Sequence, residues 1–306
     1  MPVILAFDVG ENLLTPLVTG IIQGSVYGLL GLGLVLLYKG NRIFNFAQGE
    51  FGTVAALVVY AFASGSKFLP KMPYAVAVLL GVLAGILMGL LTERLVVRPL
   101  FRQPKVTLVV ATAGVALLSI AVEGFFAGAA PTPVRATLEG EAINTRLLRV
   151  TKQDMLVVAV LLVLAVASAL FFKFTQTGTA ILAVSQEPTA TSLVGISVNR
   201  ISSLTWGMAG FLGGVAGILL TGTNRVVLPG VLTGLALIPA FTAAVFGGIT
   251  SLPGAFVGGV VIGIIQQIGG TNIPADIIPS ANAVVVFLVL LGVLLVKPTG
   301  LLGKEV

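Results

Sequence analysis

Long runs of uncharged apolar residues, separated by short polar segments, recur along almost the whole chain. A helix needs about 20 such residues to cross a bilayer. The runs are continuous rather than alternating, which favours helices over the strands of a closed barrel. Lipid offers no partners to backbone amides, so the spans must satisfy their own. We therefore expect an all-α integral membrane protein, a polytopic bundle of about eight or nine transmembrane helices.

The predicted spans form a single transmembrane domain over residues 1–306. The seventh and eighth are short and flank Ile249–Gly254, so they are either two thin spans or one broken, re-entrant segment. Boundaries read from sequence carry an error of about 2–4 residues. The spans lie at about Thr15–Tyr38, Phe46–Ala63, Tyr74–Leu95, Val106–Gly128, Met155–Phe172, Ile201–Leu220, Leu235–Gly248, Ala255–Ile268 and Ala281–Val296.

Residue types that are missing exclude several classes of function. Charged residues make up only 9% of the chain, against about 25% in soluble domains, so the solvent is lipid. There is no His and no Cys, and the acids are scattered, which argues against metal sites, disulfides and nucleophilic dyads. No phosphate-binding loop occurs, and no basic cluster suggests nucleic acid. We expect no cofactor and no ATPase activity of its own.

A polar segment, Lys173–Arg200, interrupts this apolar pattern. The excess of Lys and Arg near span ends places it in the cytoplasm, with an outer loop at about 129–154. Thr179–Gln186 contains no helix breaker, Pro188 suits the first position of a second short helix, and Gly195 suits the position just past its end. Such a helix pair is either a rigid docking element for another protein or a surface loop that covers helix ends.

Four motifs in this chain resemble those of permease subunits from branched-chain amino acid ABC importers. One is Ile43–Glu50, IFNFAQGE, and two others are Gly247–Gly259 and the C-terminal KPTGLLG, Lys297–Gly303. Their order and spacing agree with the family from about residue 15 to 303. The fourth is the family's cytoplasmic coupling motif, carried here by Gly178, Ile181, Ala183, Pro188, Ala190, Gly195 and Ile196.

The resemblance implies how the chain works and what it binds. It implies a second, related permease chain, two cytoplasmic ATP-binding subunits and an extracellular or periplasmic substrate-binding protein, in a bacterial inner membrane. The ligand would be a branched-chain or other apolar amino acid, moved by alternating access. Closure of the ATP-binding subunits would push the coupling residues, which also include Glu187 and Leu193. The chain departs from the family at Gln48, where a histidine is common, and at Thr179 and Leu182, where arginines are common.

Polar residues near the start of the second span are candidates for the substrate path, and they comprise Asn45, Phe46, Gln48, Gly49 and Glu50. A carboxylate inside a span usually faces the protein interior or water. Either these residues line the path or hold a broken helix open, or Glu50 lies at the cytoplasmic interface and pairs with Arg42 or Lys39. The interface position is favoured slightly, because the span begins only a few residues earlier.

Two further residues near span ends also carry predictions. Glu123, late in the fourth span, is expected near the outer face, where it meets a soluble receptor, pairs with Arg135 or reaches to water. Trp206, near the start of the sixth span, is expected to be an interfacial anchor.

Three other functions stay open on the sequence alone. A secondary transporter driven by an ion gradient would need intramembrane acids or unwound helices, for which Glu50 and the break at Ile249–Gly254 are the candidates. A passive channel would need a symmetric ring of charges or carbonyls. An ABC permease for urea or short amides is the third, since similar permeases carry such ligands.

Overall fold

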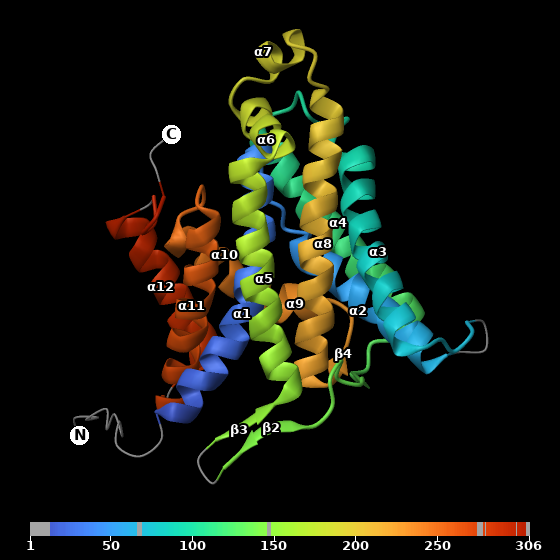
Figure 1. The fold of residues 1–306 in the computed structure, drawn as a ribbon, viewed down its shortest axis with the longest axis vertical. Coiled ribbons are helices and arrows are strands. Elements are labelled where there is room, and N and C mark those ends of the chain that lie inside the picture. The colour runs from blue at the N-terminus through green and yellow to red at the C-terminus, as the bar shows by residue number, and fades with distance from the viewer. Residues whose placement is uncertain are drawn as a thin grey trace.

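About three quarters of the chain is helical in the computed structural model, which describes residues 13–303 except 66–68, 146–147, 274–277, 279 and 298 (Figure 1). Six helices are long and apolar enough to span a membrane. They are α1 (Leu14–Asn41), α3 (Tyr74–Thr92) with its π-helical continuation Glu93–Val97, α4 (Lys105–Ala127), α5 (Lys152–Phe174), α8 (Val198–Asn224) and α11 (Leu252–Asn272).

Six shorter helices complete the part of the chain that is described. α2 (Gln48–Ser64), α10 (Leu237–Gly247) and α12 (Ala281–Val296) correspond to the second, seventh and ninth predicted spans. α6 (Gln176–Gln186) and α7 (Pro188–Leu193) form the polar segment, and α9 (Val231–Leu235) is a single short turn. The prediction of an all-α polytopic membrane protein is confirmed, while the exact number of spans is not.

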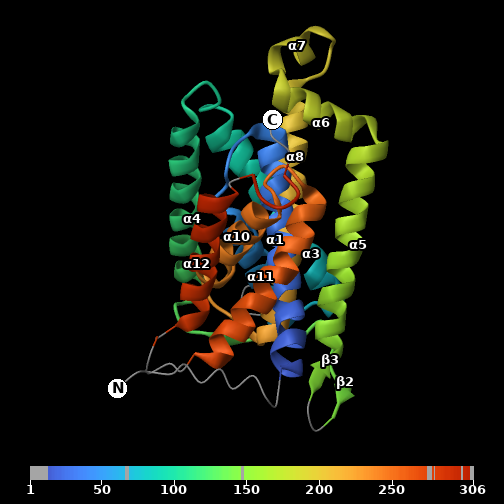
Figure 2. The ribbon, with the colours of Figure 1, turned by 90° about the vertical axis from the view of Figure 1, so that its left-hand side faces the viewer.

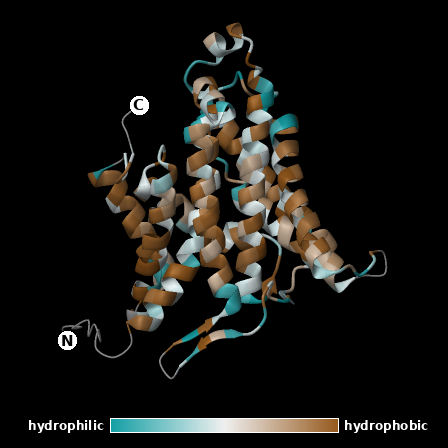
Figure 3. Ribbon diagram, in the orientation of Figure 1, coloured by the Kyte–Doolittle hydropathy of each residue, from teal (hydrophilic) through white to brown (hydrophobic). Residues whose placement is uncertain are grey.

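The bundle is built around α1 and α8, whose side chains are largely buried. The other long helices expose apolar residues on their outer faces, and polar residues gather at the two ends (Figure 3). This pattern fits a protein with lipid or another apolar chain around it. Trp206 is fully buried in α8 beside Phe51, with ring centroids 6.3 Å apart, so its prediction as an interfacial anchor was wrong. The central position of α8 is the reason.

Glycines allow the helix backbones to approach closely at the centre of the bundle. Gly24 of α1 lies against the backbone of Gly259 in α11, and an added Cβ would come within 2.5 Å of that carbonyl oxygen. Gly20 and Gly263 make the same kind of approach one turn away. In lipid, where the hydrophobic effect does not drive helices together, such contacts supply packing energy. These glycines therefore serve the packing of α1 against α11.

The predicted outer loop contains short strands. β2 (Glu141–Asn144) pairs antiparallel with β3 (Arg149–Thr151), and β1 (Thr132–Pro133) pairs with β4 (Val226–Val227). Thr151 caps α5 through a reciprocal pair of hydrogen bonds with Asp154. The strands lie at the end of the bundle opposite α7 (Figure 1).

Two segments of non-helical backbone lead into helices that contact each other inside the bundle, and we call the two segments together the intramembrane break. The first is Arg42–Ala47, which leads from α1 into α2, and the second is Leu228–Gly230, which leads from β4 into α9. As a result α10 has 11 residues, whereas α11 has 21. The seventh predicted span is therefore about half a membrane thick, and the eighth is a full span.

Candidate functional site

The segment α6–α7 projects from one end of the bundle. α6 lies across the end of α5, and α7 stands beyond it (Figure 2). Thr175 ends α5 and begins α6, because its hydroxyl accepts a hydrogen bond from the Gly178 amide at 2.9 Å. Gly178 lies so close to the end of α5 that an added Cβ would come within 2.5 Å of the Phe171 carbonyl oxygen. The sharp turn between the two helices therefore requires glycine.

The inner side of α6 anchors the segment to the bundle. Ile181 is fully buried and lies against Gly40, at the end of α1, and Val184 is buried one turn further along. α6 packs against α1, α5 and α8. The apolar side of this helix therefore faces the bundle.

α7 forms an exposed tip, which we define as residues Glu187–Gly195. Pro188 is the first residue of α7, and Gly195 follows its end with φ +87°, so both positional predictions are confirmed. Leu193 and Val194, at the end of this helix, are 83% and 75% exposed, so they face away from the bundle. The short helix instead turns Thr191 inward, where its hydroxyl donates to the Glu187 carbonyl at 2.7 Å.

The predicted coupling residues thus divide into a buried base and an exposed tip. Gly178 and Ile181 are buried; Ala183, Pro188 and Ile196 are half-buried; Glu187, Ala190, Leu193 and Gly195 are exposed.

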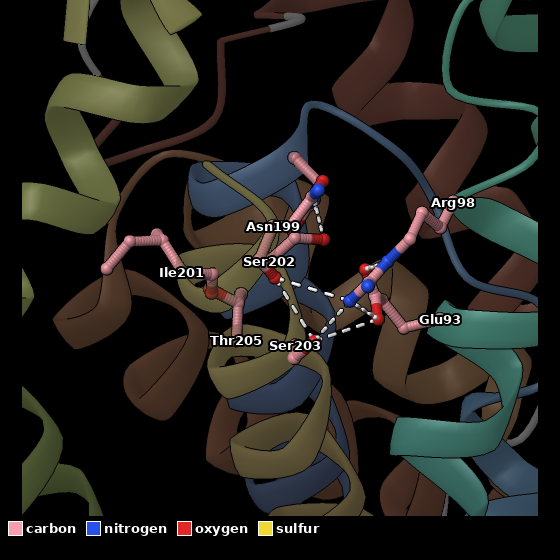
Figure 4. A network of polar contacts seen from close by, with 8 residues as sticks. Glu93, Arg98, Asn199, Ile201, Ser202, Ser203 and Thr205 are labelled. Atoms are coloured by element: carbon pink, nitrogen blue, oxygen red, sulfur yellow. Dashed lines mark hydrogen bonds and ion pairs between the residues drawn. The ribbon is translucent and has the colours of Figure 1, made fainter. Parts of the chain in front are cut away.

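A network of polar contacts ties the start of α8, which follows the tip, to α3 (Figure 4). The guanidinium of Arg98 donates to Glu93 Oε2 at 2.8 Å and to Ser203 Oγ at 2.7 Å. Ser203 in turn donates to Glu93 Oε2 at 2.9 Å. Glu93 is almost fully buried, so these contacts compensate its charge. The start of α8 is thereby joined to the end of α3.

Two motifs that are far apart in the sequence lie side by side at this end of the bundle. The amides of Leu301 and Leu302 donate to the carbonyls of Phe246 and Gly247 at 2.8 and 3.0 Å. Lys39 of α1 donates to the Thr250 carbonyl at 2.9 Å. The C-terminal motif therefore closes over the turn between α10 and α11.

The intramembrane break lies near the middle of the bundle's height. The side chain of Gln48 donates to the carbonyl of Ala209 at 3.0 Å. Ala209 is eleven residues into α8, which corresponds to about 16 Å from its start. Since the hydrocarbon core of a bilayer is about 30 Å thick, α2 begins about halfway across it.

Side chains satisfy the non-helical backbone of the break, as they must where water is absent. Asn45 Oδ1 accepts from the Ala47 amide at 3.0 Å, and Asn45 Nδ2 donates to Gln48 Oε1 at 3.3 Å. On the second segment, Thr53 accepts from the Leu232 amide at 3.3 Å. Asn45 and Gln48 are fully engaged in holding the start of α2 in place.

Phe46 and Gly49 lie on two sides of the same turn. Phe46 is 41% exposed and lines an apolar cavity of about 440 Å³ together with Phe44, Phe241 and Thr233. Gly49 lies against the backbone of Thr233 so closely that no side chain would fit there. The start of α2 is thus in direct contact with α9 beside a cavity of the size of a small-molecule site.

Glu50 is fully buried in the first turn of α2, and its favoured placement at the interface was wrong. Among the described residues it forms no ion pair with Arg42 or Lys39. The reason is that the chain re-enters the bundle before α2 begins. Of the two alternatives, a position facing the interior is the one observed.

Glu123 was also predicted wrongly. It is 5% exposed, faces the break, and accepts a hydrogen bond from the Gly230 amide at 3.0 Å. Arg135 pairs instead with Glu139 at 3.0 Å, and this contact holds the pKa of the Glu139 carboxyl below its usual value. The carboxyls of Glu50 and Glu123 are electrostatic neighbours.

Sequence reasoning missed three members of this cluster, namely Thr53, Gly230 and Thr233. Threonines and glycines are common in membrane helices, so nothing in their local pattern singles them out. Glu123 carried a usable signal, since an acid within a span is a functional candidate by default.

Comparison with known proteins identifies relatives over nearly the whole chain. Residues 17–295 match the family model described as "Branched-chain amino acid transport system / permease component". The chain is 30% identical over 301 residues to the high-affinity branched-chain amino acid transport system permease protein BraD of Pseudomonas aeruginosa, covering 95% of this chain and 96% of that protein.

Two other relatives carry similar names. The permease protein LivH of Escherichia coli K12 is 26% identical over 300 residues, covering 93% of this chain and 94% of LivH. A probable LivH of Methanocaldococcus jannaschii is 27% identical over 312 residues, covering 99% and 96%. Among solved structures, PsaBC from Streptococcus pneumoniae in complex with Fab aligns with TM-score 0.47 and 15% identity, over 95% of this chain and 94% of that chain.

The matches and the apolar helices together describe a multi-pass protein of the bacterial inner membrane, as predicted. They do not favour a secondary transporter, a channel or a carrier of urea.

Proposed function

Because the chain belongs to the permease components of branched-chain amino acid transport systems, we propose that it forms the translocation path of an ATP-driven importer. It works with a second permease chain of the same family, two cytoplasmic ATP-binding subunits and an external substrate-binding protein. The substrate is a branched-chain or other apolar amino acid. The chain has no ATPase site of its own, in keeping with a sequence that lacks a phosphate-binding loop.

The coupling residues act by transmitting a push. The observation that supports this role is the division of α6–α7 into a buried base and an exposed tip. Glu187, Ala190, Leu193 and Gly195 are accessible to a partner, while Gly178 and Ile181 fix the segment to α5, α1 and α8. A force on the tip therefore reaches the long helices, because helices and packed cores transmit displacement.

The substrate path runs through the intramembrane break. Discontinuous helices near the bilayer midplane are the usual place for substrate sites in transporters. Asn45, Gln48 and Gly49 hold the break open by satisfying its backbone and by close packing, and Phe46 presents an apolar surface to the cavity. Tilting of the helices on either side would open this layer to one compartment or the other, which is alternating access.

Uptake into sealed vesicles that contain the whole transporter tests this proposal. Labelled leucine should accumulate when ATP is supplied on the side of the ATP-binding subunits, with ionophores collapsing every ion gradient. Uptake that follows an imposed gradient and ignores ATP would contradict the proposal. Accumulation of urea with no uptake of leucine would contradict the substrate assignment alone.

A further inference from the structure

Within the part of the chain that the structure describes, two buried carboxyls lie together at the intramembrane break without a counter-ion. Glu50 is 0% exposed and Glu123 is 5% exposed. Neither oxygen of Glu50, nor Oε1 of Glu123, has a hydrogen bond of normal geometry within the described residues. The three ion pairs found in that part of the chain involve other residues. A carboxyl buried in this way is neutral unless a positive group lies beside it, and a bound cationic ligand would supply that group.

The surroundings of the pair define what kind of partner fits. Thr53 and Thr233 adjoin Glu50, and the Thr233 hydroxyl is itself buried without a hydrogen-bond partner. The carboxyl oxygens are acceptors and the Thr233 hydroxyl can donate or accept, so together they suit a small group that carries several donors. A primary ammonium group has three N–H donors and one positive charge.

An apolar cavity adjoins the same cluster through Thr233. Its volume is about 440 Å³, and Thr233 lies in its wall beside Phe241 and Leu237. Nearly all of the remaining wall is aliphatic or aromatic. A ligand with an ammonium group at one end and a branched aliphatic chain at the other would satisfy both halves of the site.

We propose that Glu50 and Glu123 form the subsite for the ammonium group of the transported amino acid, with the adjoining cavity taking its side chain. This inference rests on the proposed function for the identity of the ligand, but the ammonium subsite itself rests on the two carboxyls. The Gly230 amide holds one oxygen of Glu123 and leaves the other free for the ligand. Glu50 and Glu123 come from different helices, α2 and α4, so helix tilting would change their separation and hence the affinity.

Isosteric variants test the subsite in the assembled transporter. Glu50→Gln and Glu123→Gln should each lower leucine uptake at subsaturating leucine by at least about tenfold, because each removes a charge-assisted contact. Thr221→Val is the matched control, since its buried hydroxyl bonds only to its own helix. Uptake by both glutamine variants at the wild-type rate would overturn the proposal and would indicate a proton held between the carboxyls.

A second measurement uses the wild-type complex and so does not depend on how the variants fold. The apolar reagent dicyclohexylcarbodiimide should form an adduct at Glu50 or Glu123, located by mass spectrometry. Isopentylamine should slow this reaction by about tenfold once the site is nine-tenths occupied, whereas 4-methylpentanoate, which lacks the ammonium group, should not. Absence of an adduct, equal effects of the two compounds, or protection by sodium chloride alone would overturn the proposal.

The two measurements separate this inference from the proposed function. If the wild type accumulates no leucine with ATP but isopentylamine protects the carboxyls, the proposed function fails and the ammonium subsite stands. If leucine accumulates and neither the variants nor the protection show an effect, the subsite fails and the proposed function stands.

Discussion

The exposed tip at Glu187–Gly195 and the intramembrane break differ in how far their side chains are exposed. The tip keeps its functional side chains free, with Leu193 83% exposed and few contacts to the bundle beyond Thr191. The break encloses its polar side chains, and Asn45, Gln48 and Thr53 hold backbone that no helix satisfies. In the proposed function the tip depends on a partner, whereas the break depends on its own internal contacts. Substitutions in the tip should impair function without impairing the fold, whereas those in the break should affect both.

The strongest test of this contrast is at Leu193. The change Leu193→Asp should reduce ATP-driven uptake by at least about tenfold, because it places a charge in an interface built for an apolar side chain. The free energy of unfolding of the variant should stay within about 0.5 kcal/mol of the wild-type value, as for other surface changes. Ile143→Asp, exposed on the strand pair at the opposite end, is the control. Normal uptake by Leu193→Asp would remove the functional half of the comparison.

Close packing beside the break gives the next largest effect. In Gly217→Ala the added methyl would meet the backbone of Gly52, so α2 and α8 would have to separate. Overpacking of this kind costs about 1–3 kcal/mol. The unfolding midpoint in detergent should fall accordingly. Gly292→Ala, where nothing lies within 4 Å, should leave it unchanged. Equal midpoints for the two variants would show that the break is less tightly enclosed than the structure indicates.

A substitution in the network at Arg98 should affect both stability and function, because the network lies between the tip and the bundle. Arg98→Ala would leave the buried Glu93 carboxylate with Ser203 as its partner. We expect a loss of about 1–2 kcal/mol, less than for a fully buried pair because Arg98 is 29% exposed. ATP hydrolysis should continue while uptake per ATP falls. Arg98→Lys should retain part of the stability and part of the uptake per ATP. Wild-type uptake per ATP in Arg98→Ala would argue against transmission through this network.

The smallest effect is expected at Gln48. Gln48→Leu removes hydrogen bonds to Ala209 and Asn45 and should cost about 1 kcal/mol in the free energy of unfolding. Gln103→Leu, at an exposed glutamine outside the bundle core, is the control and should have no effect. Because Gln48 does not titrate near neutral pH, uptake by the wild type should show no pH dependence from this position. A Gln48→Leu transporter as stable as the wild type would indicate that the break has other support.

Much of the fold followed from local signals in the sequence. Apolar runs located the long helices, and Pro188 and Gly195 marked the ends of α7, since both residues act through backbone geometry alone. The surroundings of Glu50, Glu123 and Trp206 could not be obtained in this way. Their positions depend on Arg42–Ala47 turning back into the bundle and on α8 lying at its centre, which are long-range properties of the packing. The motif Ile43–Glu50 was identified from the sequence. The segment that packs near it, Leu228–Gly230 with the following helix α9, carries no distinct sequence pattern.

The short length of α10 has a consequence for leakage. Its 11 residues cover about 16 Å, roughly half of the hydrocarbon thickness, and α2 likewise begins halfway across. On the proposed substrate path, the seal between the two compartments on this flank then lies where α2 and α10 pack against α9. A sliding motion of one helical turn, about 5.4 Å, is about a third of the length of α10. Such a gate would need little travel to open, and any loosening of its packing would be a source of ion leak.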